Sequence, residues 1–175
     1  MGPFKYRTLD FASRDEIAWA ARVYCESPGY WDKGWQVSSE GLKNVEATIS
    51  ASQASSESLL LVVESPNAQL VGFHWLVIEP RGPKVAKYSG YHDGRHQATC
   101  ARRVSLWVNE DCWNSGIATE LMSRGEQWAR DKGAEKISVT VHSNNTQMLA
   151  MNGKRGFVST MIEMSKDLRD RTPGR

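Results

Sequence analysis

The chain has 175 residues with 22 basic and 20 acidic side chains, a net charge of +2, and 40% hydrophobic residues. These values argue against a disordered chain, and without a run of like charge there is no basic surface for nucleic acid. No stretch of 18 apolar residues predicts a membrane span, and the first residues lack the apolar segment of a secretion signal. We therefore expect one domain over residues 1–175, located in the cytoplasm, without nucleic-acid or membrane partners.

The residues that could hold a metal are poorly arranged for it. Cys25, Cys100 and Cys112 are widely spaced and form no C-x-x-C pair, which argues against a disulfide framework and against a zinc site. The two histidines of residues 92–96 are four apart, but Gly94 between them disfavours a helix and no third ligand is near. We expect no metal cofactor.

The first part of the chain predicts a strand and two helices. Residues 4–9 alternate apolar and polar side chains, as a strand with one buried face does. Residues 14–26 have apolar side chains at helical spacing after Ser13, a predicted N-cap. A second helix is expected from its cap at Ser39 to about residue 54.

Residues 29–35, between these helices, contain three large aromatic side chains and two glycines, a composition that excludes regular structure. One interpretation is a loop held on the core by its aromatic rings. The other is a substrate lid, because loops on rigid scaffolds often carry recognition.

The middle of the chain predicts a hairpin. Residues 59–64 read as a buried strand, residues 65–68 as a turn, and residues 70–78 as the partner strand, at the centre of a sheet. Residues 79–99 are polar and irregular, and a segment of this length suggests substrate contact or a subunit interface.

A strand, a helix and a second strand follow. Residues 100–108 predict a strand, residues 115–132 an amphipathic helix that Gly133 ends, and residues 135–141 another strand. Because a helix joins the two strands, we expect them to be parallel, in a right-handed βαβ unit. A shorter helix from Asn145 and a last strand over residues 157–166 complete the chain.

The turn before this long helix predicts an anion site. The helix opens on residues 114–118, which are Asn, Ser, Gly, Ile and Ala. The first amides of a helix have no partner within it and lie at the positive end of its dipole. Main-chain N–H groups of this turn can therefore bind an anion.

Four segments carry a resemblance to a known family: VNEDCWNSGIA at 108–118, VHSNN at 141–145, KRGF at 154–157 and MSKDL at 164–168. With the order of the elements, they resemble the GNAT superfamily of N-acetyltransferases, over nearly the whole chain after about residue 59. The resemblance implies an α/β fold with a central mixed sheet of six to seven strands and about four helices.

The resemblance also implies acetyl-coenzyme A (acetyl-CoA) as the acetyl donor. Main-chain groups of Leu106, Trp107 and Val108 would pair with its pantetheine arm like an added strand. The other cofactor residues, mostly holding the pyrophosphate, would be Trp113, Asn114, Ser115, Gly116, Ile117, Ala118, Thr119, Asn145 and Asn152. The family motif has Gln or Arg where this chain has Trp113, which removes a usual polar contact.

The implied chemistry is direct attack of an uncharged amine on the thioester. The family's usual oxyanion donor corresponds to the amide of Val108, and Asn152 stands where a tyrosine commonly assists the leaving thiolate. Arg102 replaces the usual glutamate base and cannot serve as a base. His142, Glu79 and a water chain remain as alternatives.

The end of the chain departs from the family pattern. Residues 157–168 are only 12, where two antiparallel strands and a loop are usual. One of those strands is then short, missing or supplied by a second subunit, so a homodimer is among the alternatives.

The leading hypothesis is an N-acetyltransferase that acts on a primary amine of a small molecule or peptide. Its alternatives are a non-catalytic acyl-CoA-binding or regulatory module and an α/β protein that binds another phosphate. Trp31, Trp35 and Glu79 are candidate substrate contacts. The acidic residues Glu26, Asp32, Glu40 and Glu46, together with the two tryptophans, suit a cationic amine or are a solvated face.

Overall fold

The computed structural model describes residues 3–30, 34–79 and 99–160, so most of the segment expected at 79–99 lies outside the described residues. The chain forms two compact units, residues 1–140 and residues 141–175, and each is described by itself. Among the described helices, none has both the length and the apolar character needed to span a bilayer.

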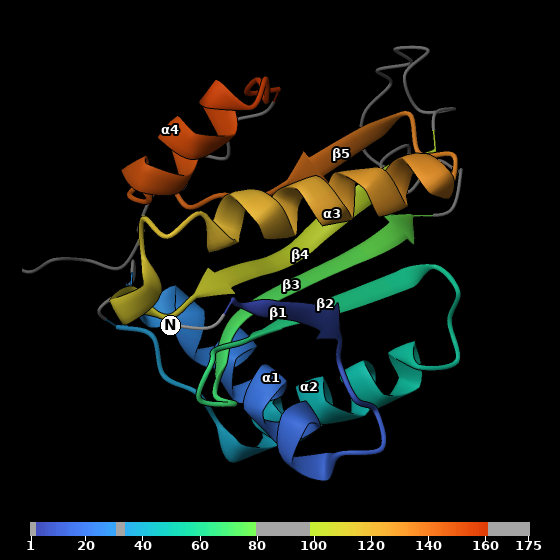
Figure 1. The fold of residues 1–175 in the computed structure, drawn as a ribbon, viewed down its shortest axis with the longest axis vertical. Helices are drawn as coiled ribbons and strands as arrows, with labels where there is room; N and C mark the ends of the chain where they lie inside the picture. The colour runs from blue at the N-terminus through green and yellow to red at the C-terminus, as the bar shows by residue number, and fades with distance from the viewer. Residues whose placement is uncertain (1–2, 31–33, 80–98, 161–175) are drawn as a thin grey trace, which may run out of the picture. The chain divides into compact units, whose positions relative to one another are not determined.

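The first unit contains one mixed sheet of five strands in the order β1-β2-β3-β4-β5 (Figure 1). Its strands are β1 (Lys5–Thr8), β2 (Ser58–Glu64), β3 (Leu70–Glu79), β4 (Cys100–Val108) and β5 (Lys136–Val139). The first four pair antiparallel in chain order, while β4 and β5 pair parallel because a helix connects them. The mixed sheet and the parallel last pair were both predicted from the sequence.

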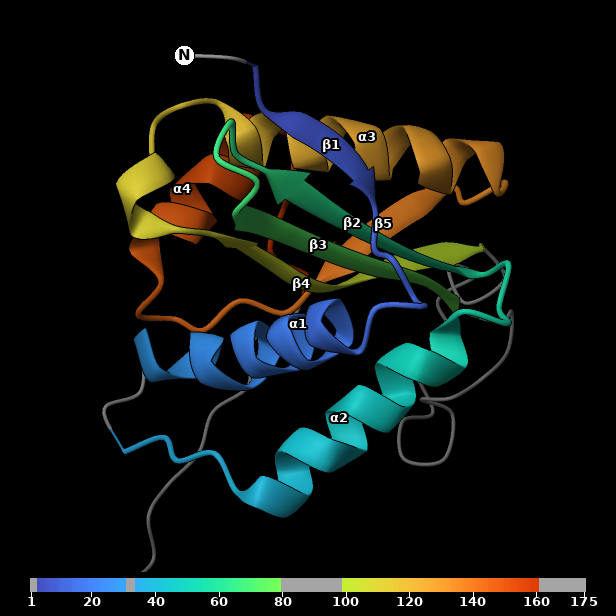
Figure 2. The ribbon, with the colours of Figure 1, turned by 60° about the horizontal axis from the view of Figure 1, so that its bottom comes forward.

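Three α-helices cover the two faces of this sheet (Figures 1 and 2). Helices α1 (Arg14–Glu26) and α2 (Ser39–Ser52) lie on one face, and α3 (Ile117–Asp131) lies on the other. Short 3-10 helices η1 (Ser27–Tyr30) and η3 (Glu110–Cys112) continue α1 and precede α3. The second unit contributes α4 (Thr146–Lys154), which makes four α-helices in the described chain.

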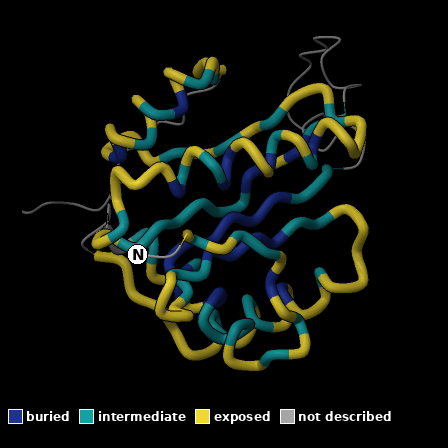
Figure 3. Tube along the Cα trace, viewed as in Figure 1, coloured by how far each residue is buried: buried dark blue, intermediate teal, exposed yellow. Residues whose placement is uncertain are grey.

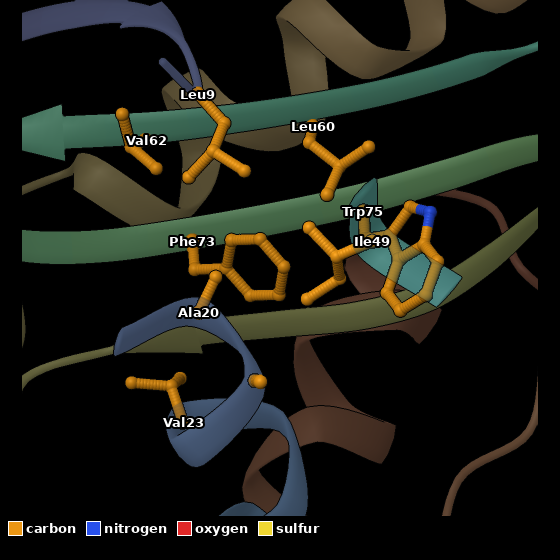
Figure 4. Packing of buried hydrophobic residues seen from close by; sticks show 9 residues of the cluster. Leu9, Ala20, Val23, Ile49, Leu60, Val62, Phe73 and Trp75 are labelled. Carbon is orange, nitrogen blue, oxygen red and sulfur yellow. The ribbon is translucent and has the colours of Figure 1, made fainter. Parts of the chain in front are cut away.

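The larger core lies between the sheet and the α1 and α2 pair (Figure 4). Phe73 and Val62 from the strands meet Ala20 of α1 and Ile49 of α2, and all four are fully buried. Burial of a side chain such as Phe73 contributes about 2 kcal/mol. Buried residues are concentrated in β2 and β3, two of the three inner strands (Figure 3).

The other face of the sheet packs closely against α3 through a glycine. A Cβ added at Gly125 would lie 2.5 Å from Cε1 of His74 and 2.9 Å from Cδ1 of Leu76. His74 is buried, and its Nδ1 lies 2.9 Å from the carbonyl oxygen of Leu121, so Nδ1–H donates to α3. Burial, with the charge of Arg103, lowers the pKa of His74 to about 3, so the imidazole is neutral.

The predicted helix starts are nearly those observed. The Ser13 hydroxyl accepts from the amide of Glu16, as an N-cap does. The second cap was wrong by one residue: Ser38, rather than Ser39, accepts from the amide of Gly41. Both serines stand before the same apolar pattern, so spacing alone does not separate them.

The expected number of strands was too high. The described residues form five strands instead of six to seven. The last strand was expected over residues 157–166, but residues 157–160 take no strand conformation, and residues 161–166 lie outside the described chain. Gly156, with φ of +86°, turns the backbone directly after α4.

Candidate functional site

Strand β4 pairs with β5 along only half of its length. The parallel ladder joins residues 100–103 of β4 to residues 136–139 of β5 and ends there. The antiparallel register with β3 shifts at the same point, because Trp75 faces Ser105 and Leu76 faces Arg103. Val104 is therefore the extra residue of a β-bulge, which bends a strand and ends regular pairing.

The register with β3 fixes which backbone groups of the second half face away from the sheet. The amide of Asn109 donates to the carbonyl of Val71 at 2.9 Å, so Val108 and Gly72 form a pair that exchanges no hydrogen bonds. The N–H and C=O of Val108 therefore point away from β3, and those of Leu106, two residues earlier, do the same.

We call these four backbone groups of Leu106 and Val108 the open edge. Among the described residues, no strand pairs with it. The indole N–H of Trp113 donates to the carbonyl oxygen of Val108 at 2.9 Å, which occupies one of the four groups. Trp107 is not part of this edge, because its backbone faces β3 and its ring packs on Trp19 with centroids 5.9 Å apart.

The turn after β4, from Asn109 to Gly116, leads the chain into α3. The Asn109 side chain accepts from the amide of Asp111, and the Asn109 carbonyl accepts from Cys112. Asn114 and Gly116 then take positive φ values of 60° and 84°. This left-handed backbone suits glycine and asparagine, and it leads the chain directly into α3.

The start of α3 offers unpaired amides to an anion. The first hydrogen bond within the helix runs from Glu120 to Gly116. Among the described residues, none accepts from the six amides of residues 114–119, and the side chain of Ser115 instead donates to the carbonyl of Cys112. Such amides at the positive end of a helix dipole can hold a phosphate.

Three predicted site residues belong to the second unit. Asn145 caps α4, with its side chain accepting from the amide of Met148 at 2.9 Å. Asn152 is buried within α4. His142 is exposed, and its Nδ1 accepts from the amide of Asn144 at 3.3 Å.

The structure does not bring Glu79 to the open edge. Glu79 faces Cys100 at one end of the β3 and β4 ladder, and Val108 lies at the other end. Val108 lies eight positions after Cys100 along the strand, which is roughly 26 Å. The carboxylate of Glu79 also accepts from Arg102 at 2.7 Å, so it forms an ion pair at that distant end.

The end of α1 combines negative charge with an exposed aromatic ring. The indole N–H of Trp35 donates to the carbonyl of Cys25 at 2.6 Å, and Trp35 is 47% exposed. Burial raises the pKa of the Cys25 thiol, and the charges of Glu26 and Glu46 raise it further, so both carboxylates lie near this thiol. Trp31, the other predicted aromatic contact, lies outside the described residues.

Metal ligands do not gather in the part of the chain that the structure describes, where no three His, Cys, Asp or Glu side chains are close enough to share an ion. The histidines of residues 92–96 are not among those residues.

Two features of this region were not predicted. The bond from Trp113 to Val108 was missed because the sequence shows only that a polar motif residue is absent. The contact of His74 with α3 was missed because the sequence does not show which helix covers a strand. A glycine at position 125, inside a strongly amphipathic helix, was the available signal for close packing.

Comparison with known families agrees with this geometry. A model described as the acetyltransferase (GNAT) family matches residues 20–157. Among curated protein sequences, none matches the chain significantly.

Solved structures with a similar fold are numerous. A tetramutant of a protein from Bacillus halodurans superposes with a TM-score of 0.71 at 15% identity, covering 95% of this chain and 100% of that one. An aminoglycoside 6'-N-acetyltransferase from Acinetobacter baumannii gives 0.63 at 16% identity, covering 95% and 99%. A glucosamine-6-phosphate N-acetyltransferase from Arabidopsis thaliana gives 0.61 at 14% identity, covering 95% and 99%. At these identities the likeness extends to the fold alone.

Proposed function

This chain belongs to the acetyltransferase (GNAT) family, and we propose that it transfers the acetyl group of acetyl-CoA to a primary amine of a small molecule or peptide. The observation that carries the proposal is two sets of unpaired backbone groups, one on the open edge and one at the start of α3, joined by the turn of residues 109–113. Both sets suit the donor, because pantetheine amides can pair with a strand and its pyrophosphate with helix amides.

The order of groups along the open edge suggests how the donor lies. The turn of residues 109–116 directly follows Val108, so an arm anchored by its pyrophosphate at residues 114–119 meets Val108 before Leu106. The thioester, at the far end of the arm, then reaches the N–H of Leu106. We therefore favour Leu106 as the oxyanion donor, with the N–H of Val108, the donor expected from the sequence, holding the arm.

In the proposed reaction the amine nitrogen bonds to the thioester carbonyl carbon and the carbon–sulfur bond breaks. The amine loses a proton and the thiolate gains one, which leaves an N-acetyl amide and the thiol of CoA. A backbone N–H facing the carbonyl oxygen stabilises the charge that develops there. An ordinary thiol has a pKa of about 8.5, so the thiolate can leave without a protein acid.

Two residues of the second unit are proposed to take part in this chemistry. An Asn152 amide can donate a hydrogen bond to the sulfur but cannot protonate it. The Nδ1 of His142 accepts the amide of Asn144 at 3.3 Å, so Nε2 carries the proton of the neutral imidazole, and His142 would act as a general base through Nδ1 after giving up this hydrogen bond. A water chain remains the alternative route for the amine proton. Asn145 is proposed to contact the cofactor.

A cationic amine is the substrate that the end of α1 supports. Glu26 and Glu46 supply negative charge near Trp35, whose exposed ring can face a cation. Helix α1 also packs beside the second half of β4, because Trp19 of α1 contacts Trp107. The two fold relatives named above as N-acetyltransferases are named for amine substrates, which supports a small-molecule amine.

The alternative is a non-catalytic module that binds acyl-CoA. Arg102 favours this module, because it stands at the family's base position, cannot accept a proton, and forms an ion pair with Glu79. Both functions use the same cofactor site, so binding does not distinguish them.

Thiol release separates the two. Purified protein would be mixed with acetyl-CoA and, in turn, aminoglycosides, polyamines, amino acids and peptides with free N-termini, and the free thiol would be recorded. We expect amine-dependent thiol release, largest for a polycationic amine. Acetyl-CoA binding by calorimetry without release across the panel would favour the module, and absence of binding would contradict both.

Two further proposals concern the setting of the protein. The three cysteines are free thiols, which suits the reducing cytoplasm. A homodimer is the second of these proposals, and sedimentation at several concentrations would test it.

A further inference from the structure

Trp113 is tied by its side chain to the strand that precedes it. Its indole N–H donates to the carbonyl of Val108 at 2.9 Å, while 41% of the residue is exposed. This bond changes what the open edge can offer to a ligand. Counted from the turn inwards, the groups are the C=O of Val108, which the indole occupies, then the N–H of Val108 and the C=O and N–H of Leu106.

The three remaining groups read donor, acceptor, donor. The last groups of an acyl-pantetheine arm read acceptor, donor, acceptor: an amide carbonyl, its N–H, and the thioester carbonyl. Each group of the arm therefore has one partner on the edge. Beyond the amide carbonyl the arm has two methylenes, which cannot donate to the carbonyl of Val108. The indole of Trp113 supplies the hydrogen bond that the arm lacks at this point.

We propose that Trp113 is a positioning residue that fixes the register of the acyl arm, because its indole N–H occupies the carbonyl oxygen of Val108 and keeps the arm from binding there. This inference rests on the proposed use of acetyl-CoA. With that carbonyl open, the N–H of the arm could bind it and the thioester carbonyl would pair with the N–H of Val108. The thioester would then lie two residues, or about 7 Å, from its place at Leu106.

A short acetyl donor makes binding in this second register measurable. The acetyl thioester of N-acetylcysteamine carries only the three groups above and no pyrophosphate, so nothing but the edge sets its position. In Trp113→Phe the N–H is lost while an aromatic ring remains. We expect kcat and KM for this donor to fall together by at least about twofold, with kcat/KM constant, since unproductive binding has this signature.

Acetyl-CoA serves as the comparison donor. Its pyrophosphate at residues 114–119 adds a second anchor that opposes the shift, so its kcat and KM should fall by a smaller factor in Trp113→Phe than those of the short donor. Replacing the indole of Trp113 by benzothiophene, through benzothienylalanine, keeps the shape and removes the N–H, and it should reproduce the Phe result. Unchanged melting temperatures would show that both variants fold.

The outcomes separate this inference from the proposed function. If the wild type neither binds nor uses acetyl-CoA, the proposed function fails. If it uses acetyl-CoA but the variant keeps the wild-type kcat and KM for the short donor, the register role of Trp113 is wrong. An equal loss of kcat/KM for both donors also contradicts it. Where turnover of the short donor is too slow to time, its Ki against acetyl-CoA should fall at least about twofold, and an unchanged Ki overturns the inference.

Discussion

Both halves of β4 pair with β3, but in the described chain only one half has a second partner strand. Residues 100–103 pair with β3 on one side and β5 on the other, and Ala101 and Arg103 are buried there. Residues 104–108 pair with β3 alone, and all of them are partly exposed. The difference shows that the candidate site is made by leaving main-chain groups without partners, beginning at the bulge of Val104.

The site also depends on where α3 begins. Contact of the second half of the helix with β3, through Gly125 and His74, holds the helix against the sheet. Its first turn then carries the unpaired amides of residues 114–119 next to the end of β4 in the chain. Side chains of α3 pack on the sheet at both ends of the helix, Ile117 and Leu121 included, while in the described chain only its N-terminal amides stay unpaired.

Gly125→Val should have the largest effect, because it forces α3 away from the sheet. Its Cβ would lie 2.5 Å from His74, in a core without room for it. We expect a loss of about 3 kcal/mol in the free energy of unfolding, measured with urea. Gln127→Val, at an exposed site on the same helix, is the control for helix propensity and should cost less than about 1 kcal/mol. Equal losses in the two variants would contradict the packing.

Gly116→Glu should weaken acetyl-CoA binding at least about a hundredfold by calorimetry, because it adds a negative charge where the pyrophosphate is expected. The φ of 84° also strains any residue with a Cβ, at about 1–2 kcal/mol of stability. Gly133→Glu is the matched control at the other end of α3. Its φ is 73° and, as at Gly116, a Cβ would meet nothing within 4 Å. The control should lose similar stability and bind normally; a variant at 116 that binds like the control would overturn the location of the anion site.

His74 should make stability depend on pH. Its pKa is lowered to about 3 in the folded state, while the unfolded chain protonates near 6.5. Between these values the unfolded state binds the extra proton, so stability falls as the pH falls through this window. From pH 7 to pH 5 the loss is about 2 kcal/mol in urea unfolding. The hydrogen bond to Arg7 also lowers the pKa of Glu16.

His74→Asn tests this assignment, since asparagine can still donate to the carbonyl of Leu121 but does not titrate. The variant should lose most of the pH dependence between pH 5 and pH 7. A wild-type slope in the variant would show that another group is responsible.

Arg102→Gln should have the smallest effect, because it removes only an exposed ion pair in the fully paired half of β4. The side chains of Arg102 and Glu79 are 48% and 36% exposed. We expect a change of less than about 0.5 kcal/mol in stability and no change in the Kd for acetyl-CoA. A marked loss of acetyl-CoA affinity would mean that the paired half of the strand belongs to the cofactor site.

The sequence predicted the layout because its local signals are strong. The apolar run of residues 59–64, the turn that follows, and the amphipathic pattern before Gly133 specify a hairpin and a βαβ unit. The parallel pairing of β4 and β5 then followed from the intervening helix, and the pair is observed. Each of these features depends on residues close together in the chain.

The details of the site depended on contacts between distant residues. The bulge at Val104 reflects register with β3, which no local pattern specifies. The ladder places Glu79 beside Cys100, at the end of β4 away from Val108, which its position next to a proline in the sequence does not show. Trp113 read as a lost contact, although its indole binds the backbone of Val108. Sequence motifs located the turn, but hydrogen-bond partners decided what it can bind.

Amide hydrogen exchange, measured residue by residue by NMR with and without acetyl-CoA, tests the main-chain site most directly. The account predicts that acetyl-CoA slows exchange at Leu106, Val108 and residues 114–119, because these amides gain partners. Exchange at residues 100–103, which are already paired on both sides, should not change. Saturation with acetyl-CoA that leaves exchange at Leu106, Val108 and residues 114–119 unaltered would contradict the account.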